Sequence, residues 1–105
     1  MSHIEKLKEF LKVNPNDCFL KHALALEYIK LNDDVIAQQL FEENLNFNPN
    51  YVATYYHLGK LLERKAAYNE AIQIYKDGIV VAQAQNDQHS KGELNTALLL
   101  LEDEE

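Results

Sequence analysis

The chain has 105 residues, of which 47% are hydrophobic, a size that buries one modest core, so we expect a single domain over residues 1–105. The net charge of -7 argues against nucleic-acid binding, which relies on clustered lysine and arginine opposite phosphates. No stretch approaches the roughly 20 apolar residues of a membrane span, and the lone Cys18 fits a reducing compartment. We therefore expect a cytoplasmic protein that binds neither nucleic acid nor membrane.

A period of 34 residues runs through the sequence. The tripeptide Asn-Pro-Asn at 14–16 recurs at 48–50, and the positions beyond it match in phase. The matching pairs are Leu24 with Leu58, Ala25 with Gly59, Ala37 with Ala71, and Phe41 with Tyr75. Strand signals are absent, so the fold class predicted is all-α. Such a period predicts stacked helical hairpins and a binding surface in place of a catalytic pocket.

The first predicted helix begins at a capping-box spacing, Ser2 to Glu5, and runs to about Val13. Its apolar residues have helical spacing and predict one buried stripe of Ile4, Leu7, Phe10 and Leu11. Leu7, Leu11 and Val13 lie 34 residues before Phe41, Leu45 and Phe47. This helix therefore corresponds to the second half of a repeat.

Four further helices form two antiparallel hairpins, because the turns between them are short. We expect them at 17–31 and 35–47, and then at 51–65 and 68–84. The polar run at 32–34 ends one helix and caps the next.

The last segment opens with a polar connection at 83–89, which we expect to be flexible. A second capping-box spacing, Ser90 to Glu93, starts a capping helix whose stripe is Leu94, Ala97, Leu98 and Leu101. The acidic residues at 102–105 predict a solvated terminus, with an acidic docking tail as the alternative. The predicted divisions are thus a half-repeat helix at 1–15, repeats at 16–49 and 50–83, and the connection, capping helix and tail at 84–105.

The second repeat resembles the tetratricopeptide repeat (TPR) family. The residues that carry the resemblance are Tyr55, Leu58, Gly59, Leu62, Tyr68, Ala71, Tyr75 and Gly78. Gly59 and Ala71 are small where the two helices of a hairpin approach each other, and the tyrosines fill the gaps around them. The first repeat departs from the pattern, since Lys21 replaces a large aromatic residue and Asp34 replaces a tyrosine.

The resemblance implies a short right-handed solenoid of about six helices that holds a peptide or amphipathic helix of a partner protein. It also implies a concave groove lined by the first helix of each hairpin. By position, the groove residues would be Phe19, His22, Leu26 and Ile29, followed by Ala53, Tyr56, Lys60, Glu63 and Arg64. The clamp with which some family members bind acidic chaperone tails is not expected, because His22, Leu26 and His57 stand at clamp positions.

No cofactor, metal or catalytic role is predicted. His22 and His57 would need further ligands to hold a metal, and neither has a cysteine or serine partner in a nucleophile arrangement. Core packing is the favoured reading for Tyr28, Tyr55, Tyr68 and Tyr75, which fall where a repeat needs aromatic residues.

Tyr56 points about a hundred degrees away from Tyr55 around the helix, so either it lines the groove or the terminal helix covers it. Lys60, Glu63 and Arg64 have the spacing of an intrahelical ion pair. Leu99 and Leu100 lie off the stripe of the last helix, and a second copy of the chain could bind there. We therefore predict a non-catalytic module that binds another protein, with a self-associating structural unit, such as a homodimer, as the alternative.

Overall fold

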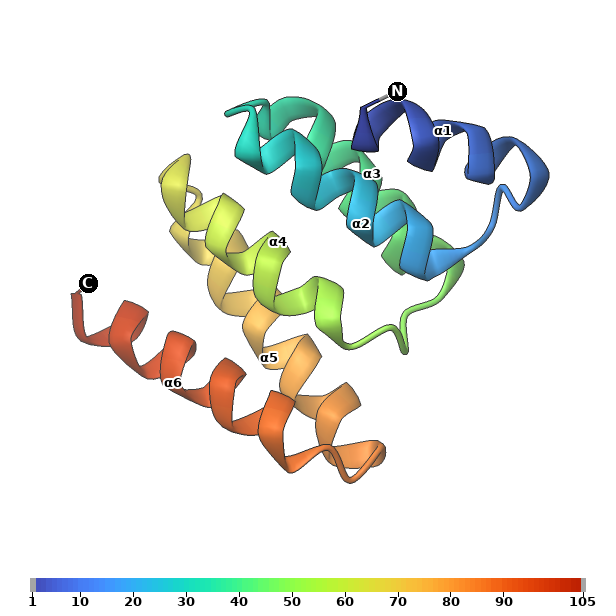
Figure 1. The fold of residues 1–105 in the computed structure, drawn as a ribbon. Helices are drawn as coiled ribbons and strands as arrows, with labels where there is room; N and C mark the ends of the chain where they lie inside the picture. The colour runs from blue at the N-terminus through green and yellow to red at the C-terminus, as the bar shows by residue number, and fades with distance from the viewer. Residues whose placement is uncertain (1, 105) are drawn as a thin grey trace. The chain divides into compact units, whose positions relative to one another are not determined.

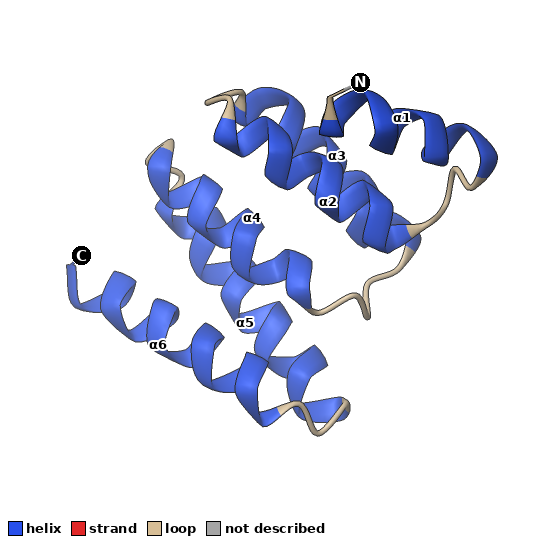
Figure 2. Cartoon of the chain, viewed as in Figure 1, coloured by secondary structure: helices blue, strands red, loops and turns tan. Residues whose placement is uncertain are grey.

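The computed structural model describes residues 2–104, and side chains over residues 2–103. Residues 2–104 contain six helices and no strand, which confirms the all-α class (Figures 1 and 2). The helices are α1 (His3–Val13), α2 (Cys18–Lys30), α3 (Asp34–Phe47), α4 (Ala53–Arg64), α5 (Tyr68–Ala84) and α6 (Gln88–Glu104). Each predicted helix is thus present, with ends that shift by a few residues.

The chain divides into two compact units, Met1–Pro49 and Asn50–Glu105, and each is described by itself. Unit 1 holds the α2/α3 hairpin with α1 against α2, and unit 2 holds the α4/α5 hairpin with α6 against α5 and α4. The expectation of one domain over 1–105 stays a prediction.

Side chains cap all three helices of unit 1. The hydroxyl of Ser2 accepts a hydrogen bond from the amide of Glu5 at 3.1 Å. The carboxylates of Asp17 and Asp33 cap α2 and α3 in the same way, at 3.0 and 3.2 Å. Asn32, before the last of these caps, takes the left-handed backbone conformation that asparagine tolerates, with φ 60°. The predicted stop-and-cap at 32–34 is therefore confirmed.

In unit 2 the starts of α4 and α5, at Val52 and Ala67, have no side-chain cap. At the start of α6, the prediction of a capping box beginning at Ser90 is wrong. Asp87 is the cap: its carboxylate accepts hydrogen bonds from the Ser90 amide at 3.0 Å and the Ser90 hydroxyl at 2.7 Å. These two bonds also lower the pKa of Asp87. The 83–89 connection shrinks accordingly to 85–87, because the helices extend into it from both sides.

The core of unit 1 lies between α2 and α3. Its buried residues are His22, Leu24, Ala25, Ala37, Phe41 and Asn44. The predicted stripe of α1 is only partly covered: Ile4, Leu7 and Leu11 are half-buried, whereas Phe10 is 57% exposed. Among the helices of this unit α1 packs chiefly against α2, and one main partner helix cannot cover the whole stripe.

The core of unit 2 depends on two glycines that face tyrosine rings. A Cβ on Gly59 would overlap the ring of Tyr75, and one on Gly78 would lie 2.6 Å from the Cβ of Tyr55. Both tyrosines are buried, so the close approach of α4 and α5 requires both glycines. Tyr68, predicted as a core aromatic, is 43% exposed, because it is the first residue of α5 and lies at the end of the hairpin.

Candidate functional site

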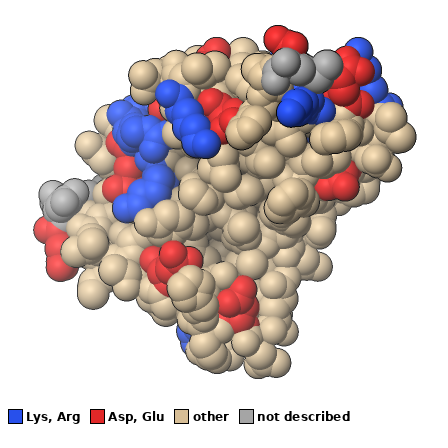
Figure 3. Space-filling view, in the orientation of Figure 1, with Lys and Arg blue, Asp and Glu red and all other residues tan. Residues whose placement is uncertain are grey.

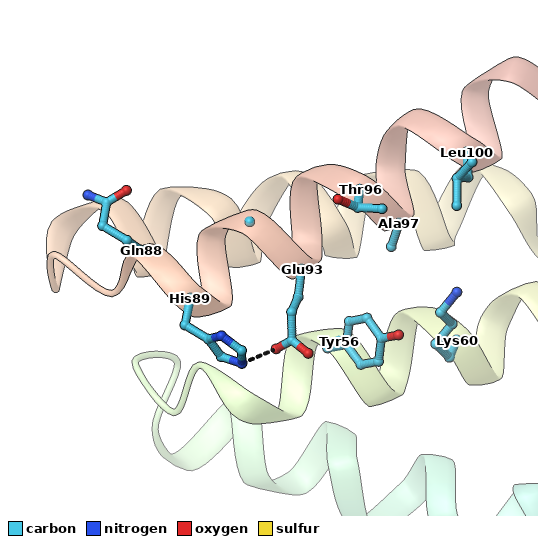
Figure 4. Close-up of a pocket in the computed structure, with 9 residues that line it drawn as sticks. Tyr56, Lys60, Gln88, His89, Glu93, Thr96, Ala97 and Leu100 are labelled. Carbon is cyan, nitrogen blue, oxygen red and sulfur yellow. Dashed lines mark ion pairs between the residues drawn. The ribbon is translucent and has the colours of Figure 1, made fainter.

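An open pocket of about 580 Å³ lies in unit 2 between α4 and α6 (Figure 4). From α4 it is lined by Tyr56 and Lys60, two of the predicted groove residues. From α6 it is lined by Gln88, His89, Gly92, Glu93, Thr96, Ala97 and Leu100. In Figure 4, Tyr56 and Lys60 project from α4 toward the helix that carries Thr96, Ala97 and Leu100.

Tyr56 and Lys60 form a small cluster on the α4 wall. The ammonium of Lys60 lies 5.6 Å from the centroid of the Tyr56 ring, a cation–π distance. The same ammonium lies 3.8 Å from a carboxylate oxygen of Glu63, which is the intrahelical ion pair that the spacing predicted. Tyr56 is half-buried. Each of the two predictions for this residue is therefore partly right, because the terminal helix α6 faces it across the pocket but leaves part of its side chain exposed.

The α6 wall is mixed in polarity. His89 and Glu93 form an ion pair at 3.4 Å toward one end of the pocket, drawn as a dashed line in Figure 4. Toward the other end Leu100 is 57% exposed. The pocket therefore offers an aromatic ring, an ammonium group and a leucine to one ligand.

Glu63, another predicted groove residue, is bound to a residue of the core. It accepts a hydrogen bond from the hydroxyl of Tyr75, which is fully buried. Burial, and then this carboxylate, raises the pKa of Tyr75 above its ordinary value. Glu63 therefore joins the α4 surface to the hairpin interior.

The remaining predicted groove residues differ in exposure. Phe19 on α2 is 68% exposed, and Leu26 and Ile29 are half-buried. His22, predicted as a surface or partner-contact residue, is only 8% exposed, because its ring packs 5.5 Å from that of Phe41. That leaves little of His22 for a partner. In unit 2, Ala53 and Arg64 are exposed.

A second cleft, of about 440 Å³, lies in unit 1 between α1 and α2. It is lined by His3, Lys6, Leu7, Phe10, Ala23, Leu26, Glu27 and Lys30. Glu27 pairs with His3 and with Lys30, each at 2.9 Å, and Lys30 followed by His3 lowers its pKa.

Sequence reasoning missed this cleft because it placed Phe10 in a buried stripe. The sequence did contain a signal, because α1 matches the second helix of a repeat. In unit 2 that helix is α5, which packs against both α4 and α6, whereas α1 packs chiefly against α2.

Within residues 2–103, no group of three or more histidine, cysteine or acidic side chains could hold a metal ion. None of the described helices is long and apolar enough to cross a membrane. On the face drawn in Figure 3, both signs of charge appear and most of the visible surface belongs to uncharged residues.

Curated relatives match only part of the chain. Mouse aspartyl/asparaginyl beta-hydroxylase is 33% identical to it over 73 residues, which is 70% of this chain. The human protein of that name is 32% identical over the same length. The match spans about a tenth of the length of these relatives, 10% in each case.

Solved structures match nearly the whole chain. The tetratricopeptide repeat domain protein of Salinibacter ruber is 44% identical, with a TM-score of 0.82 over 85% of this chain and 99% of that one. The TPR2B domain of yeast Sti1, solved in complex with pHsp70, has a TM-score of 0.89 at 17% identity over 97% of this chain and 82% of that one. No protein-family model matches the sequence. The bacterial relative nevertheless decides the assignment, since it is matched over almost its full length, and the chain belongs to the tetratricopeptide repeat family.

Proposed function

We propose that the chain is a non-catalytic module that binds a peptide segment or an amphipathic helix of another protein. Binding would use the exposed faces of the first helix of each hairpin, α2 and α4, which we call first-type helices. The observation that carries the proposal is the unit 2 pocket, where Tyr56 and Lys60 face Leu100 across an open space. Aromatic residues contribute much of the energy of peptide recognition, and a lysine beside the ring selects for an acidic neighbour. The TPR2B domain of Sti1, solved with pHsp70, supports this class of function.

The proposed contact residues on α4 are Tyr56, Lys60 and Arg64. On α2 they are Phe19, Leu26 and Ile29, whereas His22 is buried against Phe41. The expected ligand has an apolar or aromatic anchor for the pocket and an acidic residue near Lys60. The cytoplasmic location stays a prediction.

A displayed library of random peptides tests the proposal. We expect the chain to select sequences in which an apolar anchor lies close to an acidic residue. Binding of a selected peptide should weaken at least tenfold in Tyr56→Ala and several-fold in Lys60→Ala, but not in Val80→Ala, which alters an exposed residue of α5.

Nuclear magnetic resonance of the labelled protein then locates the peptide. Shifts confined to residues around Tyr56, Lys60 and Leu100 would support the pocket. Equal binding by Tyr56→Ala and wild type, with no shifts at α4 or α6, would reject it. A loss of thermal stability in Tyr56→Ala as large as the loss of binding would reassign that residue to the core.

A further inference from the structure

Two helices correspond to different halves of one hairpin. α1 has the character of a second helix, because its Leu7 lies 34 residues before the buried Phe41 of α3. α6 has the character of a first helix, because its buried Leu94 matches the buried Leu58 of α4. The offset is 36 residues, two more than the period, and the preceding helix α5 has 17 residues where its counterpart α3 has 14. In each complete hairpin of the chain, one helix of each character packs against the other.

The cleft of unit 1 has the lining that accepts a first-type helix. Its α2 residues are Ala23, Leu26, Glu27 and Lys30. The residues 70 positions later are Glu93, Thr96, Ala97 and Leu100, and all four line the pocket through which α6 faces α4. α2 therefore presents toward the cleft the face that α6 presents toward α4.

The wall formed by α1 is the other half of this lining. Leu7 and Phe10 project into the cleft, and Phe10 remains 57% exposed. A helix laid between α1 and α2 would complete a hairpin with α1 and remove this ring from water.

The surface of α6 complements this cleft in apolar contact and in charge. Leu99 is 61% exposed and lies 36 residues after Glu63, the residue through which α4 reaches Tyr75 of α5. The residue two periods before Tyr75 is Leu7, so Leu99 would meet Leu7 in a composite hairpin.

Acidic residues at 102 and 103 follow Leu99 on α6. The cleft has Lys6 and Lys30 on its rim against the single carboxylate of Glu27, with His3 beside it. The apolar and charged parts of the two surfaces therefore match.

We propose that α6 of one copy of the chain docks in the cleft between α1 and α2 of a second copy. The contact joins two different surfaces, so copies associate head to tail. This goes beyond the function proposed above, which concerns another protein at the Tyr56 pocket.

Paired variants test the docking. Phe10→Asp alters the cleft alone and Leu99→Glu alters α6 alone. Their matched controls are Phe47→Asp on α3, where the phenylalanine is 58% exposed, and Val80→Glu on α5, where the valine is 69% exposed. Sedimentation equilibrium from micromolar to millimolar protein should show mass rising with concentration for the wild type and both controls. Each interface variant should stay monomeric to at least tenfold higher concentration.

Mixing the two interface variants gives the decisive result. The mixture retains one intact cleft and one intact α6 surface, so it should form a one-to-one dimer and grow no further. Circular dichroism verifies that each variant is folded, and Lys6→Glu, at an exposed position, replaces Phe10→Asp if that variant loses helicity.

Three outcomes would overturn the docking: a wild type that is monomeric throughout, a mixture that stays monomeric, or association that persists in either variant alone. Persistence in Phe10→Asp alone would indicate pairing of two α6 surfaces. Leu99→Glu should still bind peptides at the Tyr56 pocket, which separates failure of this inference from failure of the proposed function.

Discussion

The two units form the same hairpin repeat, but they differ in how much helix capping and how much core packing stabilise it. Unit 1 caps the starts of α2 and α3 with Asp17 and Asp33, whereas unit 2 leaves the equivalent starts of α4 and α5 without a side-chain cap. Unit 2 instead buries two tyrosines against two glycines, Tyr75 at Gly59 and Tyr55 at Gly78. The two units therefore hold equivalent hairpins together by different means, with side-chain caps in unit 1 and close interhelix packing in unit 2.

One departure from the family pattern in unit 1, at Lys21, is accompanied by a second change on α3. Tyr55 and Gly78 correspond to Lys21 and Asn44. Asn44 is 1% exposed and donates a hydrogen bond to the carbonyl of Cys18 at 3.1 Å. Lys21 turns to Glu43 on α3, at 3.5 Å. A change of size on one helix is thus matched by a change on the other.

The largest effect is expected from Gly59→Ala, which removes the close approach that unit 2 depends on. The new methyl group overlaps the ring of Tyr75, and the buried ring has no space to retreat, so the free energy of unfolding should fall by about 3 kcal/mol. Urea unfolding followed by circular dichroism measures it. Gly92→Ala is the matched control, because no atom lies within 4 Å of its added Cβ, and it should be neutral or raise stability by up to ~1 kcal/mol. Equal losses in both variants would contradict the packing argument.

A second comparison exchanges one hydroxyl between the units. Tyr75→Phe removes a hydrogen bond to the Glu63 carboxylate and should cost about 1.5 kcal/mol in free energy of unfolding. Phe41→Tyr adds a buried hydroxyl to unit 1, where Ile29 stands at the position of Glu63, and should cost about 2 kcal/mol. Ile29→Glu combined with Phe41→Tyr should cost less than the sum of the two single variants. A double-mutant cycle measures that difference, and strict additivity would rule out the transferred pair.

Helix caps give the next smaller effect. Asp33→Ala removes the cap of α3 and should lower the free energy of unfolding by about 1 kcal/mol. Ala67→Asp places the same residue at the equivalent position of unit 2 and should raise stability by up to ~1 kcal/mol. Thermal denaturation of the two variants beside the wild type shows both signs. If Ala67→Asp proves destabilising, the start of α5 does not tolerate the geometry found at α3.

The smallest expected effect is an acid sensitivity specific to unit 2. Burial lowers the pKa of His57 below 6.5, assisted by Arg64 and opposed by Glu93, whereas the equivalent residue of unit 1 is Ala23. A histidine with a lowered folded-state pKa binds fewer protons when folded. Its contribution is therefore present above the unfolded pKa and is lost as the pH falls through the folded one.

We therefore expect wild-type stability to decline from pH 7.5 to pH 5, and His57→Gln to reduce that decline. Urea unfolding at several pH values measures both slopes, with Glu93→Gln as a control for the opposing charge. Identical slopes in wild type and His57→Gln would assign the acid sensitivity to other groups.

Much of the site could be predicted from repeat positions, but the state of each residue could not. Tyr56 and Lys60 lie in the unit 2 pocket, as residues on the exposed side of a first-type helix should. His22 stands at the position equivalent to Tyr56 and is nevertheless buried against Phe41. Sequence position indicates which way a side chain leaves the helix, whereas the neighbouring helix decides whether solvent reaches it.

The sequence by itself determined the helices, their order and the hairpin contacts, because these depend on short-range periodicity, turn residues and complementary sizes such as Gly59 with Tyr75. The tertiary structure decided what covers each helical face. It exposed Phe10, whose stripe has one partner helix, and Tyr68, which lies at the end of a hairpin. It also made Asp87, ahead of Ser90, the cap of α6. A periodic pattern defines a face of a helix, but only packing over longer distances along the chain supplies or withholds the second surface that buries it.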